Sequence, residues 1–198
     1  MKTFLFHLAV VLFAGLMSVS LATAQQVLAI KSLAEKRVTE LPSGELFWRI
    51  DTFGTVAEAR VAAGPWSLVA EAAGKVWLFT LGAAGGSSAN ATKVAEVGPI
   101  PRITATEYLL RINDASGPPG SVTPVHSHPG SEAFFVLTGE QSIRGAHGVM
   151  RVKAGQAEAG QGAEKAMQVS SSGSTDLHAL VMFVVDASKP FSSRATIP

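Results

Sequence analysis

The chain has 198 residues, of which 47% are hydrophobic and 16% are charged, which indicates a globular protein with one core. It contains no cysteine, so disulfides and thiolate chemistry are excluded. Its formal net charge of +1 and the lack of a basic patch argue against nucleic-acid binding.

Residues 1–24 are predicted to form a secretory signal peptide. Lys2 precedes an apolar run from Phe4 to about Val19, and Ala22-Thr23-Ala24 is a small-residue cleavage site. The alternative is an uncleaved membrane anchor, which the polar Gln25-Gln26 after that site argues against. Cleavage near Ala24 leaves 15 basic and 15 acidic residues. We expect a periplasmic or secreted product that is free of the membrane after cleavage.

The next segment, residues 25–44, is predicted to be an N-terminal arm or a short helix, because its sequence fits both. From residue 45 to 187, short apolar runs of four to nine residues alternate with glycine-containing turns. This spacing is typical of an all-β antiparallel sandwich or barrel. Residues 188–198 remain as a C-terminal tail. The chain lacks the glycine-rich nucleotide motifs and the Gly-x-Ser-x-Gly elbow.

The stretch GSVTPVHSHPGSEAFFVLTG, residues 120–139, holds the candidate site. If it is extended up to His128, then His126 and His128 share a face, because side chains alternate along a strand. If the Pro129-Gly130 bend brings Glu132 beside them, two imidazoles and one carboxylate converge. This donor set suits a divalent transition metal such as Fe, Mn, Zn or Ni. The alternative is a solvent-facing strand end with Glu132 on an exposed rim.

The spacing resembles the first signature motif of the cupin superfamily. It reads Gly120, five residues, His126-Ser127-His128, three residues, Glu132, six residues and Gly139. The resemblance implies a double-stranded β-helix, a jelly-roll barrel, in which His126, His128 and Glu132 are metal ligands. It also implies that a dimer is common.

The second cupin motif is only partly present. Gly155 and Gly162 match it, but its proline is missing and Lys165 stands where the family has a histidine. A fourth ligand therefore comes from Glu164, Gln168 or His178, or is absent, or the metal itself has been lost.

Several other side chains have simpler interpretations. His178 shares a face with apolar residues of LHALVMFVV, which favours a core histidine over a ligand, and His147 is typical of a hairpin turn. Lys165 is predicted to be a solvated loop lysine. Phe134 is the aromatic residue expected to reach the pocket. Further polar candidates for the pocket, which the sequence does not place, are Thr138, Arg144, Gln168 and Ser170.

Two classes of function fit these features. The first is an exported metal-binding cupin-domain protein that holds a small molecule in its barrel without catalysis. The second is a metal-dependent cupin enzyme of the dioxygenase or isomerase type, acting on a small oxygenated substrate. The incomplete second motif favours the first. The strand AFFVL is apolar on both faces, so it needs cover on both, from a homodimer partner or from the barrel's own second sheet.

Overall fold

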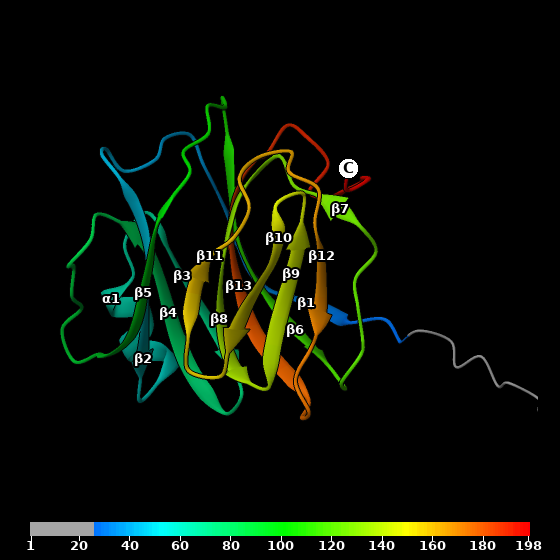
Figure 1. The fold of residues 1–198 in the computed structure, drawn as a ribbon. Coiled ribbons are helices and arrows are strands. Elements are labelled where there is room, and N and C mark those ends of the chain that lie inside the picture. Colours follow the sequence, from blue (N-terminus) through cyan, green and yellow to red (C-terminus); the bar gives the residue numbers. More distant parts are fainter. Residues whose placement is uncertain (1–25) are drawn as a thin grey trace, which may run out of the picture.

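The computed structural model describes residues 26–198, and the predicted signal peptide lies outside this range (Figure 1). Within the range the regular secondary structure consists of strands apart from one short helix, which confirms the predicted all-β class. No helix there is long and apolar enough to cross a membrane. The elements are β1 (Ala29–Val38), β2 (Leu46–Phe53), α1 (Val56–Ala62), β3 (Ser67–Ala72), β4 (Lys75–Gly82), β5 (Thr92–Ile100), β6 (Tyr108–Gly117), β7 (His126–Ser127), β8 (Gly130–Thr138), β9 (Glu140–Gly145), β10 (Gly148–Lys153), β11 (Ala157–Ala159), β12 (Gln168–Ser171), β13 (Leu177–Asp186) and β14 (Ser193–Arg194).

The strands from β6 to β13 form a jelly roll. One sheet has the order β6-β13-β8-β11, and the facing sheet has the order β10-β9-β12. An antiparallel bridge between His126 and Met167 places β7 beside the chain that leads into β12. Counted from β6, the two sheets hold strands 1-8-3-6 and 2-7-4-5, which is the strand order of a double-stranded β-helix. The predicted barrel is therefore present.

The N-terminal segment is extended. β1 runs antiparallel to β6, from Ala29 opposite Ser116 to Val38 opposite Tyr108, and adds a fifth strand to the first sheet. Of the two alternatives for residues 25–44, the helix is therefore wrong. Tertiary pairing decided between them, because a sequence such as KSLAEKRV suits either conformation.

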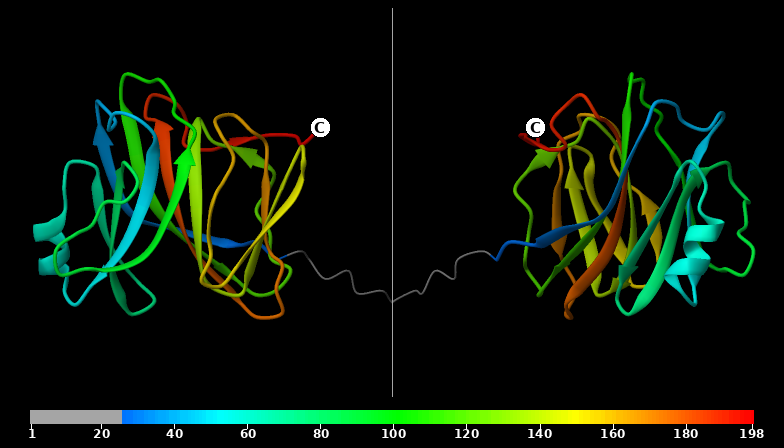
Figure 2. Two further views of the ribbon diagram at one scale, coloured as in Figure 1. Left: turned by 60° about the vertical axis from the view of Figure 1, so that its left-hand side comes forward. Right: turned by 180° about the vertical axis from the view of Figure 1, so that it is seen from behind.

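A further four-stranded sheet, β3-β4-β2-β5, covers the outer face of the five-stranded sheet (Figure 2). The range 45–187 thus contains this sheet in addition to the eight jelly-roll strands. Its buried tryptophans, Trp48 and Trp77, belong to the same core as Leu110 and Ile112 of β6. The short helix α1 begins with a capping box, in which Thr55 and Glu58 bond each other's backbone N–H, and packs Ala59 against Leu78.

Alternate side chains of β8 and β13 belong to two different cores. Ala133 and Phe135 of β8 face the four-stranded sheet, whereas Phe134 and Val136 face the barrel interior. The doubly apolar strand is thus covered on both faces by the chain's own sheets. It gives no support to the predicted homodimer, which stays a prediction.

Candidate functional site

The two histidines lie where the strand periodicity predicted. His126 exchanges two backbone hydrogen bonds with Met167, of 2.9 and 2.8 Å, and this fixes β7 in an extended conformation. The imidazoles of His126 and His128 consequently lie on one face, with ring centres 4.9 Å apart.

The Pro129-Gly130 bend then brings Glu132 next to His128. A Cβ atom on Gly130 would lie only 2.1 Å from the carbonyl oxygen of Val184, so glycine lets the start of β8 press directly against β13. In the resulting arrangement, Nε2 of His128 lies 4.0 Å from Oε2 of Glu132. The bend thus places Glu132 beside His128, which is the condition that the metal-site interpretation of the sequence requires.

Glu132 and His128 are both buried, with 2% and 5% of their surface exposed. Burial raises the pKa of Glu132 to about 8, which a backbone hydrogen bond from Gln161 offsets only in part. Burial also lowers the pKa of His128 to about 4. Oε1 of Glu132 has no hydrogen-bond partner among the described residues. Among residues 26–198, no lysine or arginine forms an ion pair with this carboxylate, and the one basic side chain within 4.0 Å of it is His128.

Both imidazoles are oriented by backbone carbonyl groups. Nδ1 of His126 lies 2.8 Å from the carbonyl oxygen of Pro124, and Nδ1 of His128 lies 2.7 Å from that of Phe191. A carbonyl oxygen only accepts, so each Nδ1 carries a proton, and in the neutral imidazole Nε2 is the nitrogen that keeps a lone pair for a ligand. Histidines that bind metals in proteins commonly have this second hydrogen bond.

The chemistry of these donors fits a divalent cation, because the two imidazoles and a buried carboxylate that has an unused oxygen line the same cavity. As the side chains stand, however, no three His, Asp or Glu side chains within residues 26–198 form a group that could hold a metal ion. The triad is adjacent in pairs, His126 to His128 and His128 to Glu132. Coordination of one ion by all three requires side-chain movement.

The side chains of the three candidates for a fourth ligand do not line the cavity, although the backbone N–H of Glu164 donates a 2.8 Å hydrogen bond to the carbonyl oxygen of His128. Glu164 is exposed and forms a 3.2 Å ion pair with Lys189. The amide of Gln168 bonds other protein groups. Nε2 of His178 lies 2.7 Å from Oδ2 of Asp114, on the face of β13 that also carries Leu180 and packs away from the barrel interior.

The remaining polar candidates also lie away from the triad. Lys165 is exposed, as predicted. His147 lies in the two-residue turn between β9 and β10, also as predicted. Thr138, Arg144 and Ser170 contribute nothing to the cavity beside the triad.

That cavity has a volume of about 340 Å³ and opens beside His126, His128 and Glu132. Phe134 lines it, which confirms the expectation for this residue. The sequence did not single out Asn113 of β6, Ile30 of β1 or the C-terminal residues, which also line it. The remaining lining residues are Ala115, Thr123, Pro124, Val125, Val169, Val181, Phe183, Phe191, Ser192, Ser193 and Arg194.

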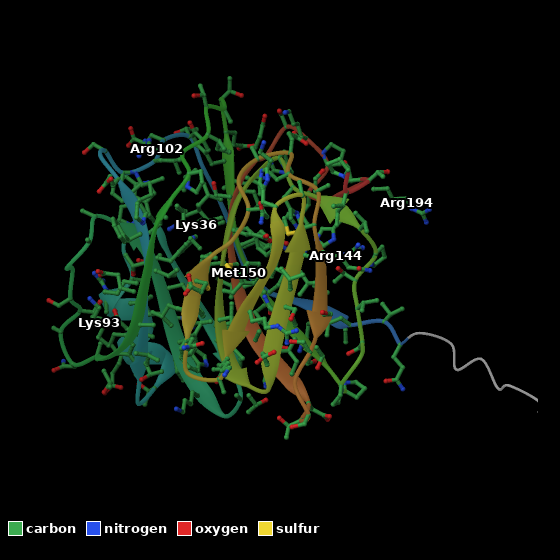
Figure 3. All side chains as sticks on the ribbon, viewed as in Figure 1. Lys36, Lys93, Arg102, Arg144, Met150 and Arg194 are labelled. Atoms are coloured by element: carbon green, nitrogen blue, oxygen red, sulfur yellow. The ribbon has the colours of Figure 1, made fainter. Side chains whose placement is uncertain are left out.

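The C-terminal tail closes one side of this cavity, and we call its residues 190–195 the C-terminal strap. β14 pairs with β7, with Arg194 opposite His126, and the Phe191 ring packs on His128 with 4.8 Å between ring centres. The guanidinium carbon of Arg111 lies 4.2 Å from the centre of the Phe191 ring. Figure 3 places Arg194 on the C-terminal side of the molecule, away from Lys93 of β5. A lone phenylalanine among polar residues was the available sequence signal for this contact.

The strand order defines a double-stranded β-helix protein, and the cavity is an open pocket lined by strands of its barrel. No family model and no curated protein matches the chain. Similar solved structures include a cupin superfamily protein from Desulfitobacterium hafniense, with 17% identity and a TM-score of 0.35, covering 39% of this chain and 68% of that one. A cupin-like protein from Thermotoga maritima has 16% identity and a TM-score of 0.39, covering 44% and 65%.

A polyketide cyclase from Streptomyces resistomycificus is also similar, with 15% identity and a TM-score of 0.37, covering 45% of this chain and 62% of that one. The chain thus spans less than two thirds of the length of the Thermotoga maritima protein and of the polyketide cyclase. The resemblance to cupins that the motif predicted is confirmed at the level of the fold, and the strand order carries that conclusion.

Proposed function

We propose that the protein binds a divalent transition metal ion through His126, His128 and Glu132, and a small, mainly apolar molecule in the adjoining cavity. The observation that carries the metal site is the buried Glu132 carboxyl, whose Oε1 atom has no hydrogen-bond partner among the described residues. A buried carboxylate is costly without a compensating cation. His128 is the nearest side chain that could carry a positive charge, but burial lowers its pKa to about 4 and so favours its neutral form.

The protein's own contribution is to orient the ligands. The carbonyl groups of Pro124 and Phe191 hold the two imidazoles with Nε2 unprotonated. The rings of Phe183 and Phe191 each pack on the His128 ring with centres within 4.9 Å, and this restricts its rotation and excludes water. A metal ion bound there would supply a Lewis acid at one end of the cavity.

The cavity supports the second half of the proposal. Its volume of about 340 Å³ falls at the lower end of the range for small-molecule pockets, which is roughly 300–1,000 Å³. Aliphatic and aromatic side chains make up most of its wall. Such a wall gains free energy by burying apolar surface of a ligand, at about 25 cal/mol for each Å².

Binding without catalysis is the function that this lining supports best. Outside the triad, Arg194 is the only titratable side chain among the described residues that line the cavity, and it is exposed at the rim. Acid or base catalysis needs a titratable group within hydrogen-bond reach of the substrate. Action outside the cytoplasm, which the signal peptide predicts, remains part of the proposal.

Elemental analysis of the protein purified without chelators tests the metal site. We expect about one transition metal ion per chain in the wild type, and loss of that ion in His126→Ala and in Glu132→Gln. Glu164→Gln is the matched control, since Glu164 is an exposed glutamate outside the cavity, and it should keep the metal. A metal-free wild type that takes up none of Fe(II), Mn(II), Zn(II) or Ni(II) on incubation would contradict the proposal.

A further inference from the structure

A second buried polar group without a hydrogen-bond partner among the described residues lines the same cavity. Asn113 of β6 has only 3% of its surface exposed, and its Oδ1 atom has no hydrogen-bond partner among the described residues. It lines the cavity together with Glu132. Buried amides in proteins are nearly always hydrogen-bonded, so an unpartnered amide oxygen on a residue that lines a cavity indicates a missing partner.

The sheet register separates Asn113 from the metal-binding end. Asn113 pairs with Val181 of β13, which pairs with Phe134 of β8. The Phe183 and Glu132 pair lies two residues further along, about 6.6 Å away, and β6 lies two strands from β8, about 9.5 Å away. Val181 and Phe134 therefore form an apolar floor between the Asn113 amide and the Glu132 carboxyl.

No neighbouring group among the described residues bonds the side-chain oxygen of Asn113. Asn113 is flanked in the sheet by Ser32 of β1 and by Val181. The Ser32 hydroxyl bonds Glu35 and Arg111 instead. An apolar side chain of the same size would avoid the cost of an unsatisfied buried group.

We propose that Asn113 determines which molecules the cavity accepts, and that the accepted class is small phenols and alcohols. Such a molecule would lay its apolar part on Val181 and Phe134 and bond its hydroxyl to the Asn113 amide. An ionic group at this end would be buried without a counter-charge beside it, because Glu132 lies two strands away from Asn113 and Arg194 is exposed and pairs with His126. The inference rests on the small-molecule half of the proposed function.

Binding of p-cresol and p-xylene to the purified protein tests this assignment. The two probes have nearly the same shape, and a hydroxyl in the first replaces a methyl group in the second. We expect the wild type to bind p-cresol about five to ten times more tightly, as one net hydrogen bond allows. Asn113→Leu should abolish that preference, and Asn113→Ser should retain part of it. Titrations followed by two-dimensional NMR give both dissociation constants and locate the probes.

A matched control separates specificity from packing. Val181→Ala removes apolar surface from the same wall, so it should weaken both probes by a similar factor and leave their ratio unchanged. Asn113→Leu should melt at the same temperature as the wild type or higher, which shows that it folds.

Each outcome has a defined reading. Equal affinity of the wild type for the two probes, or a preference that survives in Asn113→Leu, would overturn the role of Asn113 and leave cavity binding intact. Failure of both probes to bind the wild type would overturn it together with the small-molecule half of the proposed function. Metal content, measured on the same sample, reports separately on the other half.

Discussion

Nδ1 of His128 lies 2.7 Å from the carbonyl oxygen of Phe191, a residue 63 positions further along the chain. This hydrogen bond makes the C-terminal strap part of the candidate metal site. The strap also covers the imidazole with the Phe191 ring. A segment that looks like a polar tail in the sequence therefore holds one of the three proposed ligands in position.

Removal of residues 190–198 should weaken metal binding about 10- to 100-fold, the range found when a partner of a ligating histidine is lost. Isothermal titration with Zn(II) measures the change. Phe191→Leu keeps the carbonyl group and loses the ring, so it should have a smaller effect. Unchanged affinity in the truncated protein would show that the strap does not orient His128.

The metal-free protein should lose stability as the pH rises from about 6.5 to 8. The pKa of Glu132 is raised by burial from 4.5 to about 8, so the folded chain binds more protons than the unfolded chain in this window. His128, whose pKa is lowered from 6.5 to about 4, contributes the opposite slope mainly below pH 6.5 and only a small part of it above. One titrating proton gives a slope of at most about 1.4 kcal/mol per pH unit, and since Glu132 is half ionised near pH 8 the net loss expected over the window is about 1 kcal/mol.

Urea unfolding with EDTA present, at pH 6.5 and pH 8, measures this loss. Glu132→Gln cannot ionise, so its unfolding free energy should stay nearly constant between the two pH values. A wild-type slope that survives in the variant would assign the effect to another group.

The local geometry of the site could be predicted, whereas its long-range contacts could not. The shared face of His126 and His128 follows from strand periodicity, and the bend before Glu132 follows from Pro129-Gly130. The Phe191 contact and the inward position of Asn113 depend on which strands pair and in what register. No short stretch of sequence encodes that information, because both contacts join segments more than 60 residues apart.

The close contact of Gly160 with Glu132 and Phe134 is another feature that the sequence does not predict. It lies in the incomplete second motif, where the sequence gives no role for it. An added Cβ atom there would lie 2.5 Å from Cγ of Glu132 and 2.4 Å from Cε2 of Phe134. Gly160→Ala should therefore displace Glu132, lower the unfolding free energy by about 1–3 kcal/mol and weaken metal binding.

Thermal or urea unfolding, together with metal analysis, checks this expectation. Gly82→Ala is the matched control, because a Cβ atom at Gly82 would meet nothing within 4 Å. Equal behaviour of the two variants would mean that the loop around Gly160 moves aside freely.

His178→Gln should leave the metal content unchanged. Nε2 of His178 is bonded to Asp114, and the residue lies on the face of β13 opposite Val181 and Phe183, which line the cavity. Elemental analysis of the variant beside the wild type decides the point. Loss of the metal would identify His178 as a ligand and would require β13 to rearrange.

Alternate side chains of β13 belong to two different cores, so the two cores are expected to unfold together. Leu180 and Met182 anchor the four-stranded sheet, while Val181 and Phe183 line the barrel interior, so neither layer can separate without stripping one face of the same strand. The two layers should behave as one cooperative folding unit with a single calorimetric transition. Amide protons of β13 should exchange with solvent only through global unfolding, making this strand the slowest-exchanging part of the protein.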